Sequence, residues 1–194
     1  ILADPGRASY RVGAIDALQT GTGGHNGVRI DGAGALAGSV LCNGRWSPTP
    51  YARAHITLSS FDGGFAVAHD GFARLGGIGL HERRISLTRG GVSVRDTLAG
   101  SRRARVELAW HLAPGFTPDP SGKGLARANG SLVAVNALSS DGRRPELAWG
   151  TYPFSPSYGC TVTAAVLRCT WALDLPCTIT SDLILEADHH AGAP

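Results

Sequence analysis

The stretch that decides the fold is RVELAWHL, residues 105–112, in which apolar and polar side chains alternate. Four apolar side chains would share one face of an extended strand: Val106, Leu108, Trp110 and Leu112. The other face would carry Glu107 and His111. This period of two residues predicts a half-buried β-strand, because a helix would spread the same side chains around its surface.

The same alternation recurs along the chain and predicts seven further strands, at residues 52–58, 64–69, 78–87, 92–98, 132–137, 161–173 and 178–185. Short glycine-containing turns at 43–44, 62–64, 89–91, 129–130 and 141–142 separate these segments. Residues 114–124, rich in proline and glycine, are expected to form a long surface loop. We therefore predict an all-β fold, a large antiparallel two-sheet β-sandwich with very little helix, as a single domain over residues 1–194.

The chain begins at Ile1 and contains no methionine, so we expect it to be the C-terminal part of a larger protein. No segment approaches the roughly 20 consecutive apolar residues of a membrane span, so none is predicted. The net charge is only +3, and the arginines are scattered with Lys123 as the single lysine, which argues against nucleic-acid binding. Arginine does suit the carboxylates and sulfates of an acidic polysaccharide, because its planar guanidinium binds such anions in bidentate fashion.

The four cysteines form an even set, which favours one or two disulfides and an exported protein, secreted or associated with the cell envelope. Cys160 and Cys169 are expected to bracket a hairpin centred on 164–165 and to pair across it. Cys42 and Cys177 would then pair or remain free. Buried free thiols are the alternative, since cysteine also packs as a small apolar residue.

Two histidines stand out by their context: His25 in GGHNGVRIDG, residues 23–32, and His69 in AVAHDGF, residues 66–72. A structural interpretation of the first is that Asn26 satisfies the backbone of a glycine-rich turn. A half-buried, hydrogen-bonded histidine is the structural interpretation of His81 and His111.

The first of these segments resembles the His-Asn-Thr-Val-x-x-Asp-Gly signature of heparinase II/III-like polysaccharide lyases. Other segments resemble that family in the same order: Asp-Pro-Gly at 4–6 followed by Tyr10, and then the segments at 68–72, 81–85, 94–98, 111–114 and 155–159. The resemblance implies a C-terminal β-sandwich that packs against an N-terminal α/α toroid, with a cleft between them where uronic-acid-containing polysaccharides are cleaved by β-elimination.

Elimination requires a base and a group that neutralises the uronate carboxylate, and the resemblance places these mainly on the toroid. We therefore expect the isolated domain to be inactive and to line one wall of the cleft, with Asn26, His111 and Tyr158 as substrate-cleft candidates. The alternative is a non-catalytic carbohydrate-binding or structural β-sandwich, in which the histidines are structural.

The resemblance also implies a zinc site formed by two histidines and an aspartate, and His25 and His69 occupy the histidine positions. The third ligand is open between Asp31 and Asn43, and His55 or Asp70 could substitute for it.

Overall fold

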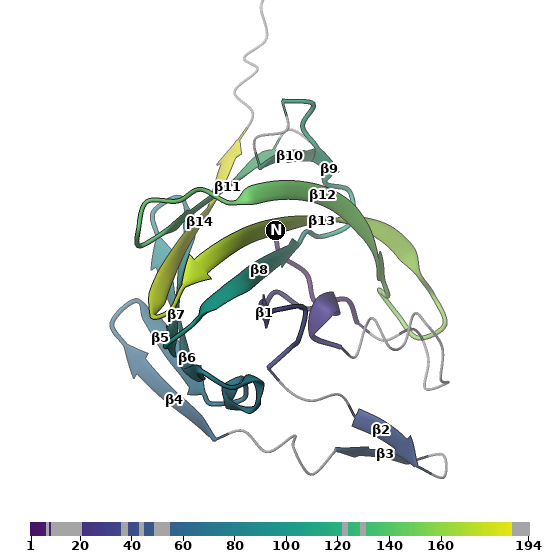
Figure 1. The fold of residues 1–194 in the computed structure, drawn as a ribbon. Coiled ribbons are helices and arrows are strands. Elements are labelled where there is room, and N and C mark those ends of the chain that lie inside the picture. The colour runs from purple at the N-terminus through teal and green to yellow at the C-terminus, as the bar shows by residue number, and fades with distance from the viewer. Residues whose placement is uncertain are drawn as a thin grey trace, which may run out of the picture.

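The computed structural model describes residues 1–6, 8, 21–35, 39–42, 45–48, 55–121, 124–128 and 131–187 of the chain. These residues form a two-layer antiparallel β-sandwich (Figure 1). The smaller sheet has the order β1 (Val28–Ile30), β8 (Arg103–His111), β13 (Val162–Asp174) and β12 (Glu146–Phe154). The larger sheet has the order β4 (Ile56–Phe61), β5 (Gly64–His69), β6 (Ile78–Thr88), β7 (Gly91–Gly100), β14 (Cys177–Ala187), β11 (Ser131–Ser139), β10 (Leu125–Ala128) and β9 (Thr117–Pro118).

Strands β2 (Ser39–Cys42) and β3 (Arg45–Pro48) form a separate two-stranded sheet. Helical structure in the described residues is limited to two 3-10 turns, η1 (Thr22–Gly24) and η2 (Ala73–Leu75). Neither these turns nor any other described segment is a helix long and apolar enough to cross a membrane. The predicted fold class is therefore confirmed.

The core lies between the two sheets, and β8 supplies its centre. The four apolar side chains predicted to share one face of β8 and the residue after it are at most 1% exposed. They belong to one buried cluster with Leu98, Ile179 and Leu183 from the larger sheet. Burial of large apolar side chains on both inner faces is the main stabilising contribution in a sandwich of this kind.

The sequence-based strand prediction was incomplete, since it did not include β1, β2, β3, β9, β10 or β12. Strand β12 was missed because it is an edge strand whose burial does not alternate, and its sequence contains Gly150 and Pro153, which an edge strand tolerates. The predicted loop at 114–124 contains β9, and β10 begins directly after it, so the chain pairs along the opposite edge of the larger sheet.

The predicted disulfide hairpin is wrong. Residues 162–174 form one continuous strand, β13, so Cys160 and Cys169 lie along the same strand direction. Val162, the first residue of the strand and two residues after Cys160, is already separated from Cys169 by about 23 Å of extended chain, whereas a disulfide needs Cα atoms within about 7 Å. Cys160, Cys169 and Cys177 are free, and burial raises the pKa of the Cys169 thiol to about 12, which makes it an unreactive core residue. The side chain of Cys42 lies outside what the structure describes.

Candidate functional site

A buried carboxylate lies at the centre of the polar network that joins the sequence motifs. Asp96 of β7 is fully buried and directly opposite Arg83 of β6. Arg83 donates from Nε and Nη2 to the two Asp96 oxygens, at 2.7 and 2.9 Å. Burial alone would raise the pKa of Asp96, but Arg83 and His81 outweigh it and hold the pKa below its usual value. Asp96 is therefore an ionised group inside the sandwich.

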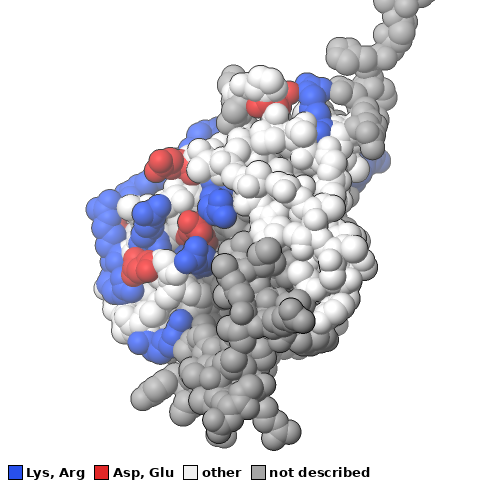
Figure 2. Space-filling view, turned by 90° about the vertical axis from the view of Figure 1, so that its right-hand side faces the viewer, with Lys and Arg blue, Asp and Glu red and all other residues white. Residues whose placement is uncertain are grey.

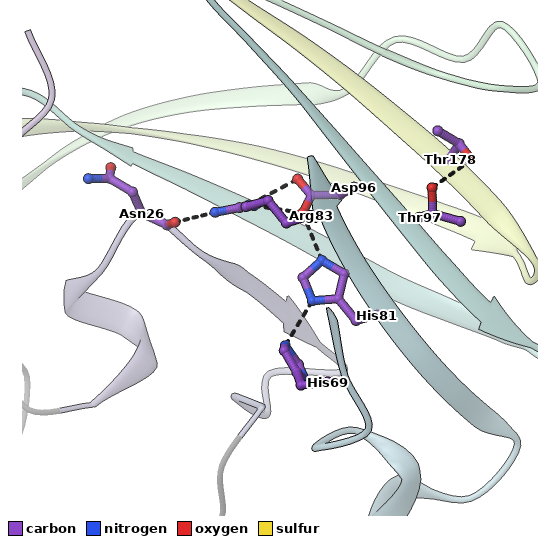
Figure 3. A network of polar contacts seen from close by, with 7 residues as sticks. All are labelled: Asn26, His69, His81, Arg83, Asp96, Thr97 and Thr178. Atoms are coloured by element: carbon purple, nitrogen blue, oxygen red, sulfur yellow. Dashed lines mark hydrogen bonds and ion pairs between the residues drawn. The ribbon is translucent and has the colours of Figure 1, made fainter. Parts of the chain in front are cut away.

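Two histidines continue this network from Asp96 toward the edge of the sheet (Figure 3). His81 Nε2 lies 2.7 Å from Asp96 Oδ1, and His81 Nδ1 lies 3.0 Å from Nε2 of His69, its neighbour on β5. The backbone N–H of Gly71 donates to His69 Nδ1 at 3.2 Å. That bond places the His69 proton on Nε2, which donates to His81, and His81 in turn donates from Nε2 to Asp96. The contacts thus define one proton arrangement with both rings neutral.

Arg83 also connects the network to the loop that precedes β1. Its Nη1 donates to the carbonyl of Asn26, as Figure 3 shows. The Asn26 side chain donates from Nδ2 to the Ala3 carbonyl at 3.0 Å and accepts the backbone N–H of His111 at 2.6 Å. Asn26 therefore ties the N-terminal segment, the 21–27 loop and the end of β8 together.

The N-terminal segment lies along the end of β8 and carries the partner of His25. Ala3 donates its N–H to the His111 carbonyl at 3.0 Å, and Leu2 bridges Leu112. His25 Nδ1 lies 2.8 Å from Asp4 Oδ2, with the two side chains 42% and 71% exposed. His25 is thus held by a carboxylate and still open to solvent.

The last motif segment, residues 155–159, packs against the N-terminal segment of the chain. Ser155 donates its N–H to the Pro5 carbonyl, and Gly159 donates its N–H to the Ala8 carbonyl, both at 2.8 Å. Gly6 has a φ of 67°, and a side chain there would collide with the Ser155 carbonyl, so the approach requires glycine. The candidate Tyr158 lies in this segment and is 66% exposed.

His111 is fully buried, not half-buried as predicted. Neither of its ring nitrogens makes a regular hydrogen bond with the described residues, and the ring stands edge-on to Tyr152 with 4.6 Å between centroids. Burial and the positive charge of Arg168 lower its pKa to about 4, although the backbone of Gly23 acts in the opposite direction. The ring is therefore neutral at physiological pH.

Stability is expected to fall as the pH drops from 6.5 toward 4. Burial and the adjacent His81 lower the pKa of His69 to about 4, as for His111, whereas both would titrate near 6.5 in the unfolded chain. In this window the unfolded chain binds protons that the folded domain excludes, so the stability present above pH 6.5 is lost progressively on acidification. Chemical denaturation at pH 7.0, 5.5 and 4.5 should reveal a fall of about 1–3 kcal/mol, since solvent screens the half-exposed His69. A His111→Leu variant should lose less stability between pH 7.0 and 4.5. A loss equal to that of the wild type would contradict the lowered pKa of His111.

The remaining metal-ligand candidates are not gathered with His25 and His69. Asp31 and Gly32, with φ values of 51° and 78°, form a tight turn, and the Asp31 carboxylate accepts hydrogen bonds from Arg102 and the Arg105 backbone. Asp70 accepts the backbone N–H of His55, and Asn43 lies outside the described residues. Within the described part of the chain, no three histidine, cysteine or acidic side chains form a group that could hold a metal ion.

The structure thus defines a class of protein: a two-sheet β-sandwich domain with a histidine-containing polar network at one end. The chain belongs to the heparinase II/III-like, C-terminal domain family, whose family model matches residues 1–180. No curated protein sequence matches the chain.

Solved structures share the fold at low identity. Heparan sulfate lyase HepC from Pedobacter heparinus is 12% identical with a TM-score of 0.66, over 98% of this chain and 29% of that protein. A HepC mutant gives 12% identity and a TM-score of 0.68, over 96% of this chain and 28% of the other. A heparinase III is 13% identical with a TM-score of 0.63, over 96% of this chain and 28% of that protein. The chain therefore spans less than a third of the length of these structures.

Proposed function

We propose that this chain is the β-sandwich domain of a lyase that cleaves an acidic, uronic-acid-containing polysaccharide by β-elimination, and that it forms one wall of the substrate cleft. One observation carries the proposal: the motif segments, although spread from residue 4 to residue 159, are joined by direct contacts. Asp96, Arg83 and Asn26 connect the segments from β5, β6, β7 and the end of β8. Residues 1–6 connect these to the segment around Ser155.

Within this wall the described residues have different tasks. His25 and Tyr158 are exposed enough to meet a substrate. Asn26 and His111 are positioning residues. Both polar atoms of the Asn26 side chain are hydrogen-bonded to backbone groups, and His111 is buried. A histidine oriented by a carboxylate, as His25 is by Asp4, suits hydrogen bonding or proton transfer to a saccharide. The base and the carboxylate-neutralising group would be supplied by the rest of the parent protein.

The charge of the smaller sheet supports an anionic substrate. Strand pairing places Arg29, Arg105 and Arg168 on its outer face, opposite the core-facing side chains. On the face that Figure 2 draws, most of the basic side chains lie toward the left, with acidic side chains between them. Arg29 is paired with Glu107 at 3.3 Å, while Arg105 and Arg168 have no ion pair within the described residues. Guanidinium groups without an ion pair are suited to bind sugar carboxylates and sulfates.

The decisive test compares the isolated chain with its full-length parent. Heparan sulfate, heparin, alginate and hyaluronan would be offered to each, and the ultraviolet absorbance of unsaturated uronate would be followed. We expect product from the parent on at least one substrate and none from the 194-residue chain. Absence of product from the parent on every uronic-acid polymer would contradict the proposal and favour a non-catalytic carbohydrate-binding sandwich.

The zinc ion implied by the resemblance stays a prediction. His25 fits a ligand, because its Nδ1 is held by Asp4 and its Nε2 has no hydrogen bond within the described residues. His69 fits only after rearrangement, since Gly71 and His81 occupy its two nitrogens. The prediction requires about one zinc ion per chain after purification, measured by elemental analysis and lost in both His25→Ala and His69→Ala. Metal-free protein, or a zinc content unaffected by both substitutions, would contradict it.

A further inference from the structure

The outer face of the larger sheet carries polar side chains that the proposed cleft does not use. On β7, β14 and β11, alternate residues such as Asp96, Ile179 and Val135 point into the core, so their neighbours point outward. Seven outward side chains of these strands lie side by side: Arg95, Thr97, Thr178, Thr180, Asp182, Asn136 and Leu138. This surface lies on the far side of the sheet from the Asp96 network.

Two adjoining hollows indent this face. The first has a volume of about 320 Å³ and is lined by Arg95, Leu138, Ser139, Ser140, Thr178 and Thr180. The second has a volume of about 270 Å³ and is lined by Asn136, Ala137, Leu138, Arg144, Thr180 and Asp182. Leu138 and Thr180 belong to both, so the hollows are continuous. Their volumes lie near the lower end of the range for ligand sites.

The charge in the first hollow is unbalanced. Arg95 lies directly opposite Arg84 on the neighbouring strand, and like charges in that position destabilise a sheet. Arg84 has two other partners, Glu82 at 3.4 Å and the Phe61 ring at 5.1 Å. Arg95 has no ion pair within the described residues, and no acidic side chain lines its hollow. An anion bound there would relieve this repulsion.

Hydroxyl side chains lie near Arg95 on this face, and Ser139, Ser140, Thr178 and Thr180 line the same hollow. Thr97 and Thr178 lie 3.4 Å apart between their Oγ1 atoms, on adjacent strands, as Figure 3 shows. Ser140 Oγ accepts the Thr178 N–H at 3.2 Å and retains its own proton for donation. The second hollow adds Arg144, the Asn136 amide and Asp182, while Leu138, 45% exposed, offers an apolar contact for a sugar ring.

We propose that these hollows form a second saccharide site, in which Arg95 binds a sulfate or carboxylate and Arg144 and Asn136 contact the adjoining sugar. The choice of a saccharide over a free anion rests on the proposed function, whereas the anion site rests on Arg95 and its hollow alone. The openness of both hollows implies weak binding, so the site would increase the time a long polymer stays on the protein without taking part in cleavage.

The test is calorimetric titration of the 194-residue chain with a heparin-derived tetrasaccharide, a neutral maltotetraose and inorganic sulfate. Arg95→Ser and Arg144→Ser should each weaken tetrasaccharide binding at least fivefold. The matched control is Arg89→Ser, which removes the same charge from the β6–β7 turn and should change the affinity less than twofold. Unchanged thermal unfolding midpoints would exclude misfolding, since both hollow arginines are exposed.

Three outcomes would overturn the proposal: no tetrasaccharide binding by the wild-type chain, equal weakening by Arg89→Ser and Arg95→Ser, or sulfate binding as strong as tetrasaccharide binding. A failure of the proposed function would be seen in a different measurement. It requires lyase activity of the parent, which Arg95→Ser should leave unchanged in kcat because Arg95 lies outside the cleft wall.

Discussion

Replacing Asp96 with asparagine is expected to destabilise the domain by about 3–5 kcal/mol. The substitution keeps the side-chain volume but removes the negative charge that pairs with Arg83 and accepts from His81. The Arg83 side chain is only 16% exposed, so its positive charge would remain in a low-dielectric environment without a negatively charged partner. Urea denaturation at pH 7 measures the loss directly.

An exposed ion pair on β6, the strand that carries Arg83, provides the control. Glu82 and Arg84 are 40% and 50% exposed and 3.4 Å apart, so Glu82→Gln should cost no more than about 1 kcal/mol. Equal losses in the two variants would mean that burial of Asp96 does not determine its contribution.

Replacing Trp110 with alanine is expected to cost about 3–5 kcal/mol, because the largest fully buried side chain of the described residues would leave a cavity between the sheets. Its ring also lies 5.6 Å from the Arg83 guanidinium, so the substitution removes a contact that helps to hold the buried ion pair. Denaturation monitored by far-ultraviolet circular dichroism gives the free energy of unfolding.

Leu87→Ala is the matched comparison for Trp110, since Leu87 is 74% exposed on the larger sheet. That variant should change the free energy of unfolding by less than about 0.5 kcal/mol. A Trp110→Ala domain as stable as Leu87→Ala would show that the sheets do not depend on this contact.

Much of the fold could be predicted from the sequence because alternation is a local property. Residues 64–69 form β5 as predicted, and 105–112 lie within a strand and its continuation with the expected buried face. Strand β12 could not be predicted in this way, because an edge strand does not need a consistently buried face. The strand predicted over 161–173 is confirmed as β13, whereas the hairpin proposed at 164–165 was wrong, because two adjacent alanines without a turn residue do not end a strand.

The candidate site was predicted in part. His25, Asn26, His69 and His111 do lie in connected segments, but Asp96, the centre of the network, was not identified as a functional candidate. A signal for it was present: the predicted turn at 89–91 sets the register of the hairpin, and that register places Arg83 opposite Asp96. The hydrogen bond of Asn26 to the His111 backbone spans 85 residues, and no local pattern predicts such a contact.

The central claim is that the end of the sandwich around His25 faces the substrate. The most direct measurement is kcat/KM of the full-length parent carrying His25→Ala, with its thermal unfolding midpoint as the control for folding. His25 is 42% exposed and is paired with a still more exposed Asp4, so the substitution should not unfold the domain. We predict at least a tenfold loss of kcat/KM, or about 1.4 kcal/mol of transition-state stabilisation, at an unchanged midpoint. Wild-type kcat/KM in this variant would contradict the account.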